Sequence, residues 1–93
     1  MRVGILQVEL ALGHAQSLKD KRKVVKSILD RARGSFNVSA AEVDANDKWQ
    51  RAVLGFSSVS NDAAYVRGQL DKLLDHLRRH PEARVSDFQV EVL

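Results

Sequence analysis

The chain of 93 residues contains no cysteine. This absence excludes a disulfide framework, a thiolate metal site and a thiol nucleophile, and it fits a reducing cytoplasm. No stretch approaches the ~20 consecutive apolar residues that a membrane-spanning helix needs. The apolar run at the N-terminus is interrupted by Gln7 and Glu9, which makes it too short for a signal peptide. We therefore expect a cytoplasmic protein with no membrane partner.

Catalytic and cofactor-binding motifs are also missing. The sequence has no Gly-rich phosphate loop and no nucleophile elbow. His76 and His80 are four residues apart but lack the intervening glutamate of a zinc-protease helix. His14, Asp44 and Asp47 could meet at one end of the fold, yet their spacing matches no metal motif, so the default interpretation is surface polar residues. The prediction is a non-enzymatic protein with no catalytic residue, metal, cofactor or small-molecule substrate.

What the chain does contain is a concentrated basic segment. The net charge is only +3, but residues 17–33 hold seven basic and two acidic side chains. Five of the basic residues fall within eight positions, at Lys19, Lys21, Arg22, Lys23 and Lys26. Localised positive potential is typical of surfaces that bind phosphate-rich partners.

Alternation of apolar and polar residues predicts four strands, over residues 3–12, 36–43, 48–60 and 85–93. In the first strand we expect the even-numbered leucines and valine to face the core. In the last strand Phe88, Val90 and Val92 are expected to point inward. The segment Asp44-Ala45-Asn46-Asp47 is rich in turn-forming residues and predicts a hairpin between the second and third strands.

Apolar residues at helical spacing predict two helices. Ser17 is the expected N-cap of the first, and Gly34 is expected to close it as the first residue beyond its C-terminus. The second starts at Ser60-Asn61-Asp62 and stops before Pro81. Gly68 lies inside the second helix at a cost of roughly 1 kcal/mol relative to alanine, so close packing is the expected reason for it.

The order β-α-β-β-α-β predicts one α+β domain over residues 1–93 with the ferredoxin-like fold. Right-handed crossovers then give a four-stranded antiparallel sheet in the order 4-1-3-2, with both helices on one face. This topology gathers three loops at one end, so the basic helix start is expected near Arg78 and Arg79. The uncovered sheet face is predicted to carry Gln7, Glu9, Trp49, Arg51, Val53 and Glu91.

The basic cluster stands at a helix N-terminus, whose partial positive charge repels cations and attracts anions. Three interpretations are open. The lysines could form a solvated face paired with Asp20, Asp44 or Asp47, a contact surface for the RNA backbone, or a surface for acidic protein partners. In the RNA interpretation the contact residues are Lys19, Lys21, Arg22, Lys23, Lys26, Arg78 and Arg79.

Trp49 is the single tryptophan, and its parity places it on the open sheet face. It could stack on an RNA base, or it could pack against a dimer partner or a neighbouring loop. Sheet-based RNA readers present two or three aromatic residues on their central strands, whereas the open face of strand 3–12 has none, which favours packing. Together with apolar residues on that face, this predicts a homodimer interface that contains Trp49, Arg51 and Val53.

The block Ser17–Ser27, SLKDKRKVVKS, resembles the signature of the YlxP-like proteins, small bacterial proteins of unassigned function. Ala41–Asp44, Trp49-Gln50 and Val59–Asp62 resemble the same family, so the similarity spans essentially the whole chain. The resemblance implies a ferredoxin-like fold and carries over no catalytic residue. Family members are typically encoded among transcription-elongation, translation-initiation and ribosome-maturation factors, which implies an RNA- or ribosome-linked role by association only. The expected function is a module that binds RNA or a ribosomal particle, and the alternative is a homodimerising protein-interaction domain.

Overall fold

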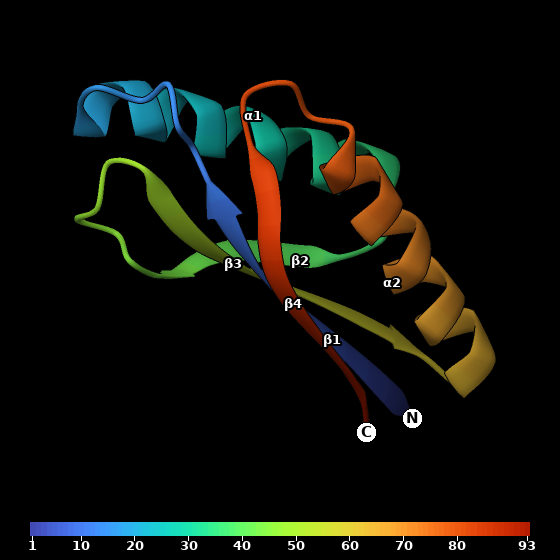
Figure 1. Ribbon diagram of the computed structural model, residues 1–93. Coiled ribbons are helices and arrows are strands. Elements are labelled where there is room, and N and C mark those ends of the chain that lie inside the picture. The colour runs from blue at the N-terminus through green and yellow to red at the C-terminus, as the bar shows by residue number, and fades with distance from the viewer.

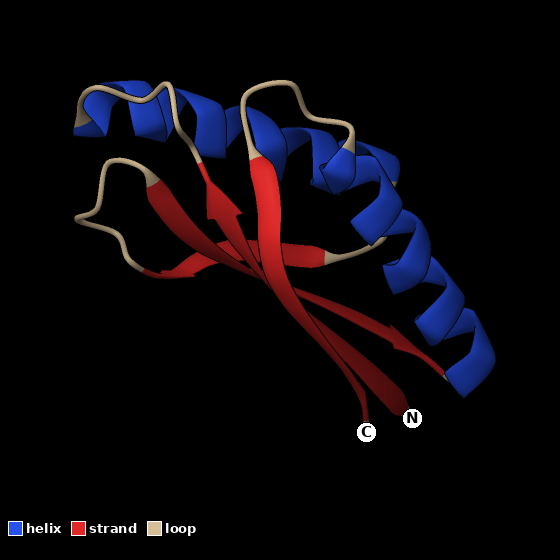
Figure 2. Ribbon diagram, in the orientation of Figure 1, coloured by secondary structure: helices blue, strands red, loops and turns tan.

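The expected elements occur in the predicted order in the computed structural model, which describes residues 1–93 (Figure 1). They are β1 (Arg2–Ala11), α1 (Leu18–Ser35), β2 (Ser39–Asp44), β3 (Arg51–Ser60), α2 (Ala63–Arg78) and β4 (Arg84–Val92). The strands pair antiparallel in the order β2-β3-β1-β4. Figure 2 shows both helices on one side of this sheet. The predicted ferredoxin-like fold, including its strand order, is confirmed.

The core lies between the helices and the two central strands. Leu6, Val8 and Leu10 of β1 are at most 1% exposed, as their alternation predicts. They belong to one cluster with apolar side chains of β3 and of both helices. Helix α2 crosses β1 so closely that a Cβ at Gly4 would lie 2.2 Å from Val66 Cγ1. The start of β1 therefore has no room for any side chain at this position.

The helix N-termini form as predicted, but two expectations about glycine are wrong. The Asp62 carboxylate caps α2 by accepting from the Ala64 N–H at 2.9 Å. Helix α1 runs through Gly34, and its C-cap is Phe36, whose N–H donates to the Ala32 carbonyl. Phe36 packs against the core, and the helix continues past Gly34 to Ser35, the residue before it. Gly68 has open space where a Cβ would stand, so close packing does not explain it.

The connection between β2 and β3 is longer than predicted and spans residues 45–50, because β3 starts at Arg51 rather than residue 48. Strand β2 also starts later than predicted, at Ser39 rather than residue 36. Long-range hydrogen bonds hold this loop against the segment that follows β1. The Leu12 N–H donates to the Gln50 carbonyl at 2.9 Å, and the Gln50 side chain donates to the Ala15 carbonyl at 3.1 Å. Trp49 consequently lies in the loop, outside β3, which corrects its predicted place on a strand.

Three loops meet at one end of the domain, and the two termini lie at the other (Figure 1). They are the segment between β1 and α1, the β2–β3 loop and the 79–83 loop that leads from α2 into β4. This gathering was expected from the topology, and it positions the candidate site. No helix of the structure is both long and apolar enough to cross a membrane.

Candidate nucleic-acid interface

The start of α1 is built by a local capping arrangement. Ser17 Oγ accepts from the Asp20 N–H at 3.1 Å, and the Asp20 carboxylate accepts from the Gln16 N–H at 3.2 Å. Two backbone donors at the helix N-terminus are thereby satisfied. The Asp20 carboxylate is engaged with the backbone and forms no ion pair with the neighbouring lysines.

Lys21 is not a surface residue, which corrects its predicted role in nucleic-acid binding. Its side chain is 1% exposed, its ammonium lies 2.8 Å from Glu42 Oε2, and it donates to the Ala45 carbonyl at 2.5 Å. It is buried because it falls on the same helix face as Val25, with Ile28 and Ala32 one and two turns further on. That i, i+4, i+7, i+11 spacing is visible in the sequence, and it was the signal that could have placed Lys21 inside.

The remaining cations at the start of α1 are exposed and form what we call the helix-start patch, which consists of Lys19, Arg22, Lys23 and Lys26. At 3.6 residues per turn the three lysines fall on the outer side of the helix, opposite the stripe that contains Lys21, and Arg22 falls on its flank. Lys26 pairs with Asp30 at 2.7 Å, whereas the other three have no ion-pair partner.

The carboxylates that could neutralise the patch do not do so. The Asp44 carboxylate accepts from the Ala45 N–H at 2.7 Å, and Asp47 forms no ion pair. The interpretation of a solvated face paired with Asp20, Asp44 or Asp47 therefore lacks the expected pairs. Three uncompensated cations at a helix N-terminus leave this end of α1 suited to an anionic partner.

Arg79 does not join the helix-start patch as the topology suggested, whereas Arg78 lines a hollow that shares His14 and Glu82 with the hollow beside Lys23. Arg79 lines a hollow together with Arg31, which lies about 20 Å along α1 from its first residue. The Arg78 guanidinium is placed 5.1 Å from the centroid of the Phe88 ring on β4. The two arginines leave the end of α2 in different directions, because successive helical residues point about 100° apart.

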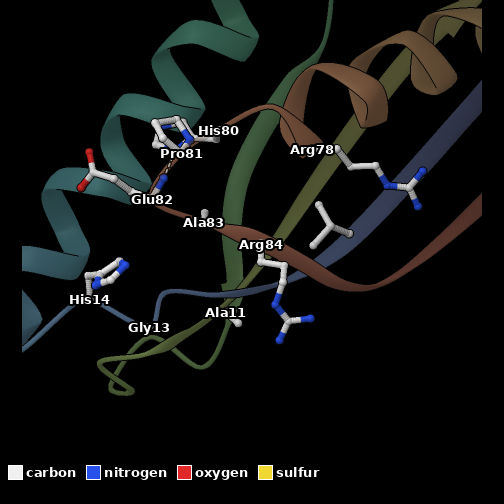
Figure 3. A pocket seen from close by; sticks show the side chains of 10 residues that line it. Ala11, Gly13, His14, Arg78, His80, Pro81, Glu82, Ala83 and Arg84 are labelled. Atoms are coloured by element: carbon white, nitrogen blue, oxygen red, sulfur yellow. Dashed lines mark hydrogen bonds between the residues drawn. The ribbon is translucent and has the colours of Figure 1, made fainter.

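The largest hollow at this end of the domain has a volume of ≈ 570 Å³ and is shown in Figure 3. Its basic side chains are Arg78, Arg84, His14 and His80, and its single acidic side chain is Glu82. No sequence pattern marks Arg84 as a functional residue, because it is a single arginine at the start of a strand. Only the pairing of β4 with β1, which sets Arg84 opposite Ala11, brings it next to the β1–α1 segment.

A hydrogen bond to His80 stabilises the conformation of the 79–83 loop. Its Nδ1 accepts from the Glu82 N–H at 3.1 Å (Figure 3). Burial lowers the pKa of His80, and the nearby positive charge of Arg31 lowers this pKa further. The neutral imidazole that results is the form that can accept the Glu82 hydrogen bond.

The predicted dimer interface is only partly exposed. Trp49 is 55% exposed in the β2–β3 loop, and Arg51 is paired with Glu9 on the open sheet face. Val53 also belongs to that face but is only 4% exposed, because it lies among the longer side chains of Glu9, Arg51 and Asp44. Its predicted place in an exposed interface is wrong. The apolar side chains that this face does expose are Ile5, Val43 and Val59.

These features define a small ferredoxin-like α+β domain whose basic helix start and adjoining loop end carry unpaired cations. Residues 3–90 match the family described as "Protein of unknown function (DUF503)". The chain is 36% identical over 80 residues to the "Uncharacterized protein YlxP" of Bacillus subtilis (strain 168), an alignment that covers 86% of this chain and 87% of that protein. The chain belongs to this family of YlxP-like domains of unknown function, as its motifs indicated.

Proposed function

We propose that this domain is a non-enzymatic module that binds RNA, free or within a ribosomal particle, through the helix-start patch. The observation that carries the proposal is the exposure of Lys19, Arg22 and Lys23 without ion-pair partners at a helix N-terminus. Lys19 stands in the first turn of α1, where the macrodipole disfavours a cation, and a bound phosphate would be attracted by all three cations. Each phosphate that a lysine or arginine neutralises also releases condensed counterions.

The test measures the affinity of the full chain for a fluorescently labelled RNA hairpin with single-stranded flanks, as a function of KCl concentration. The dissociation constant should rise steeply with salt. The double variant Arg22→Gln/Lys23→Gln should bind more weakly and should reduce the slope of log K against log salt by about 0.7–0.9 for each phosphate that it no longer neutralises. Lys21 is left unchanged, because its substitution disturbs the buried ion pair rather than the surface.

The matched control is Arg67→Gln/Lys72→Gln, which removes the same charge from exposed positions on α2. This control should bind RNA with nearly the wild-type affinity and salt slope. The proposal is wrong if the wild type binds no RNA at low salt. It is equally wrong if the two double variants are weakened to the same extent, since the effect would then follow from net charge alone.

A second candidate function is self-association through the open sheet face. The observation that favours it is a shallow groove of ≈ 350 Å³ on this face, lined by Ile5, Val43 and Gly55. A Cβ at Gly55 would lie 3.0 Å from Val43 Cγ1, so the absence of a side chain at this position deepens the groove. Exposed apolar surface of this kind is typical of protein-interaction sites.

A further inference from the structure

The ≈ 570 Å³ hollow beside the 79–83 loop has the charge of an anion-binding site. Arg78 comes from the end of α2, Arg84 from the start of β4 and His14 from the β1–α1 segment, and all three are exposed. Neither arginine has an ion-pair partner. In Figure 3, Arg84 and His14 stand on either side of Gly13 and Ala11, whose small size leaves the space between the two side chains open.

Phe88 adds an aromatic ring next to Arg78, one of the residues that line this hollow. The ring was expected to point into the core, and its pairing with Val8 does place it on the helix side of the sheet. It is nevertheless 42% exposed, because β4 is an edge strand. The Arg78 guanidinium carbon lies 5.1 Å from its centroid. An arginine guanidinium next to an aromatic ring is a planar group on which unpaired RNA bases can stack.

The hollow is continuous with the helix-start patch. His14 and Glu82 line it, and the same two residues line a smaller hollow of ≈ 170 Å³ that also contains Lys23 and Asp20. Lys23, His14 and Arg84 therefore lie along one route from the start of α1 across the loop end to β4. Glu82 is the acidic side chain that faces both hollows, so it lowers the attraction for a polyanion along this route.

We propose that the hollow holds an unpaired nucleotide of single-stranded RNA, with a phosphate between Arg84 and His14 and the base stacked on the Arg78 guanidinium. The inference rests on the proposed function and adds to it the kind of RNA that is bound. Bases in a duplex are stacked on one another and cannot reach Arg78, whereas those of a single strand can be splayed onto a side chain.

The test compares a labelled ten-nucleotide single-stranded RNA with a ten-base-pair RNA duplex by fluorescence anisotropy. Arg78→Lys keeps the charge and removes the planar group, and Phe88→Leu keeps an apolar side chain and removes the ring. Each should weaken single-strand binding by about 10-fold, the lower part of the range for removal of one stacked base, and should leave duplex binding unchanged. Glu82→Gln should tighten single-strand binding, a gain that a misfolded variant could not produce.

The matched controls are Arg79→Lys, which makes the same change at the neighbouring residue, and Tyr65→Leu, which removes a 53% exposed ring from α2. Both should bind the single strand as the wild type does. If Arg78→Lys and Glu82→Gln bind it with wild-type affinity while Arg22→Gln/Lys23→Gln binds more weakly, the inference is overturned and the proposed function stands. If the wild type binds neither the single strand nor the duplex, both the inference and the proposed function are wrong.

Discussion

The ammonium of Lys21 lies 2.8 Å from the carboxylate of Glu42, and this ion pair joins helix α1 to the edge strand β2. The lysine side chain is 1% exposed and the glutamate side chain 16%. The same ammonium also reaches the β2–β3 loop, where it donates to the carbonyl of Ala45. Ala45 has a φ of 58°, a left-handed conformation that is uncommon for alanine. Lys21 thus links α1 to β2 and to the β2–β3 loop.

Lys21→Met should destabilise the domain by about 3 kcal/mol, because the variant keeps the apolar stem but leaves Glu42 without its partner. Urea unfolding followed by circular dichroism measures the change. The double variant Lys21→Met/Glu42→Leu should recover most of the stability, since replacing both charges by apolar groups is often neutral or stabilising. A single variant as stable as the wild type would show that the pair contributes nothing.

The glycines of β1 and α2 should respond to alanine with opposite signs. Gly4→Ala should cost about 1–3 kcal/mol, because the new methyl group would lie 2.2 Å from Val66 Cγ1 and 2.8 Å from Leu70 Cδ1, so that α2 must shift. Gly68→Ala should instead stabilise the domain by about 1 kcal/mol, since it improves helix propensity where a Cβ meets open space. Thermal unfolding measures the stability of both variants relative to the wild type. A lower stability for Gly68→Ala would contradict the open space found at this position.

Acid should weaken the fold through His80. Burial, with a further contribution from Arg31, lowers the pKa of His80 in the folded state below its ordinary value of about 6.5. The unfolded chain therefore binds a proton more readily than the folded one, and stability falls as the pH drops below about 6.5 toward the folded-state pKa. His80→Asn keeps an acceptor for the Glu82 N–H but does not titrate. Its urea midpoint should fall less than the wild-type midpoint between pH 7.5 and pH 5, and equal decreases would exclude this role.

Self-association through the open sheet face predicts a different set of effects. Sedimentation velocity at increasing concentration should show a dimer, and Val43→Lys should shift it to the monomer, because a lysine would bring charge into the apolar groove beside Ile5. Trp49→Ala should leave the dimer intact, since Trp49 lies in the β2–β3 loop outside that face. Monomeric wild-type protein at every concentration would rule out this candidate function.

Local patterns carry much of the information about this fold. The alternation in β1, the apolar spacing of the helices and the cap residues Ser17 and Asp62 all act within a few residues of where they stand. The element order together with right-handed crossovers then leaves few arrangements, and the observed strand order is the one expected. The same reasoning placed Lys19, Arg22, Lys23 and Lys26 at the start of α1, where they are exposed.

Three of the errors concern residues whose surroundings come from distant parts of the chain. Val53 has the parity of the open face, but side chains of β1 and β2 cover it. Phe88 has the parity of the core, but its strand lies at the edge of the sheet. Trp49 is displaced from β3 by hydrogen bonds that tie Gln50 to the β1–α1 segment.

The class of fold, the order of its elements and the concentration of positive charge at one helix start can all be predicted from the sequence, because each of these depends on neighbouring residues. Helical spacing can assign Lys21 to the inner face of α1, but its partner Glu42, which is 21 positions away, is set by the packing of β2 on that face. The same packing of distant segments brings Arg84 and His14 to one hollow. Periodicity assigns a residue to a face of its element, whereas the partner packed on that face decides whether the residue meets solvent.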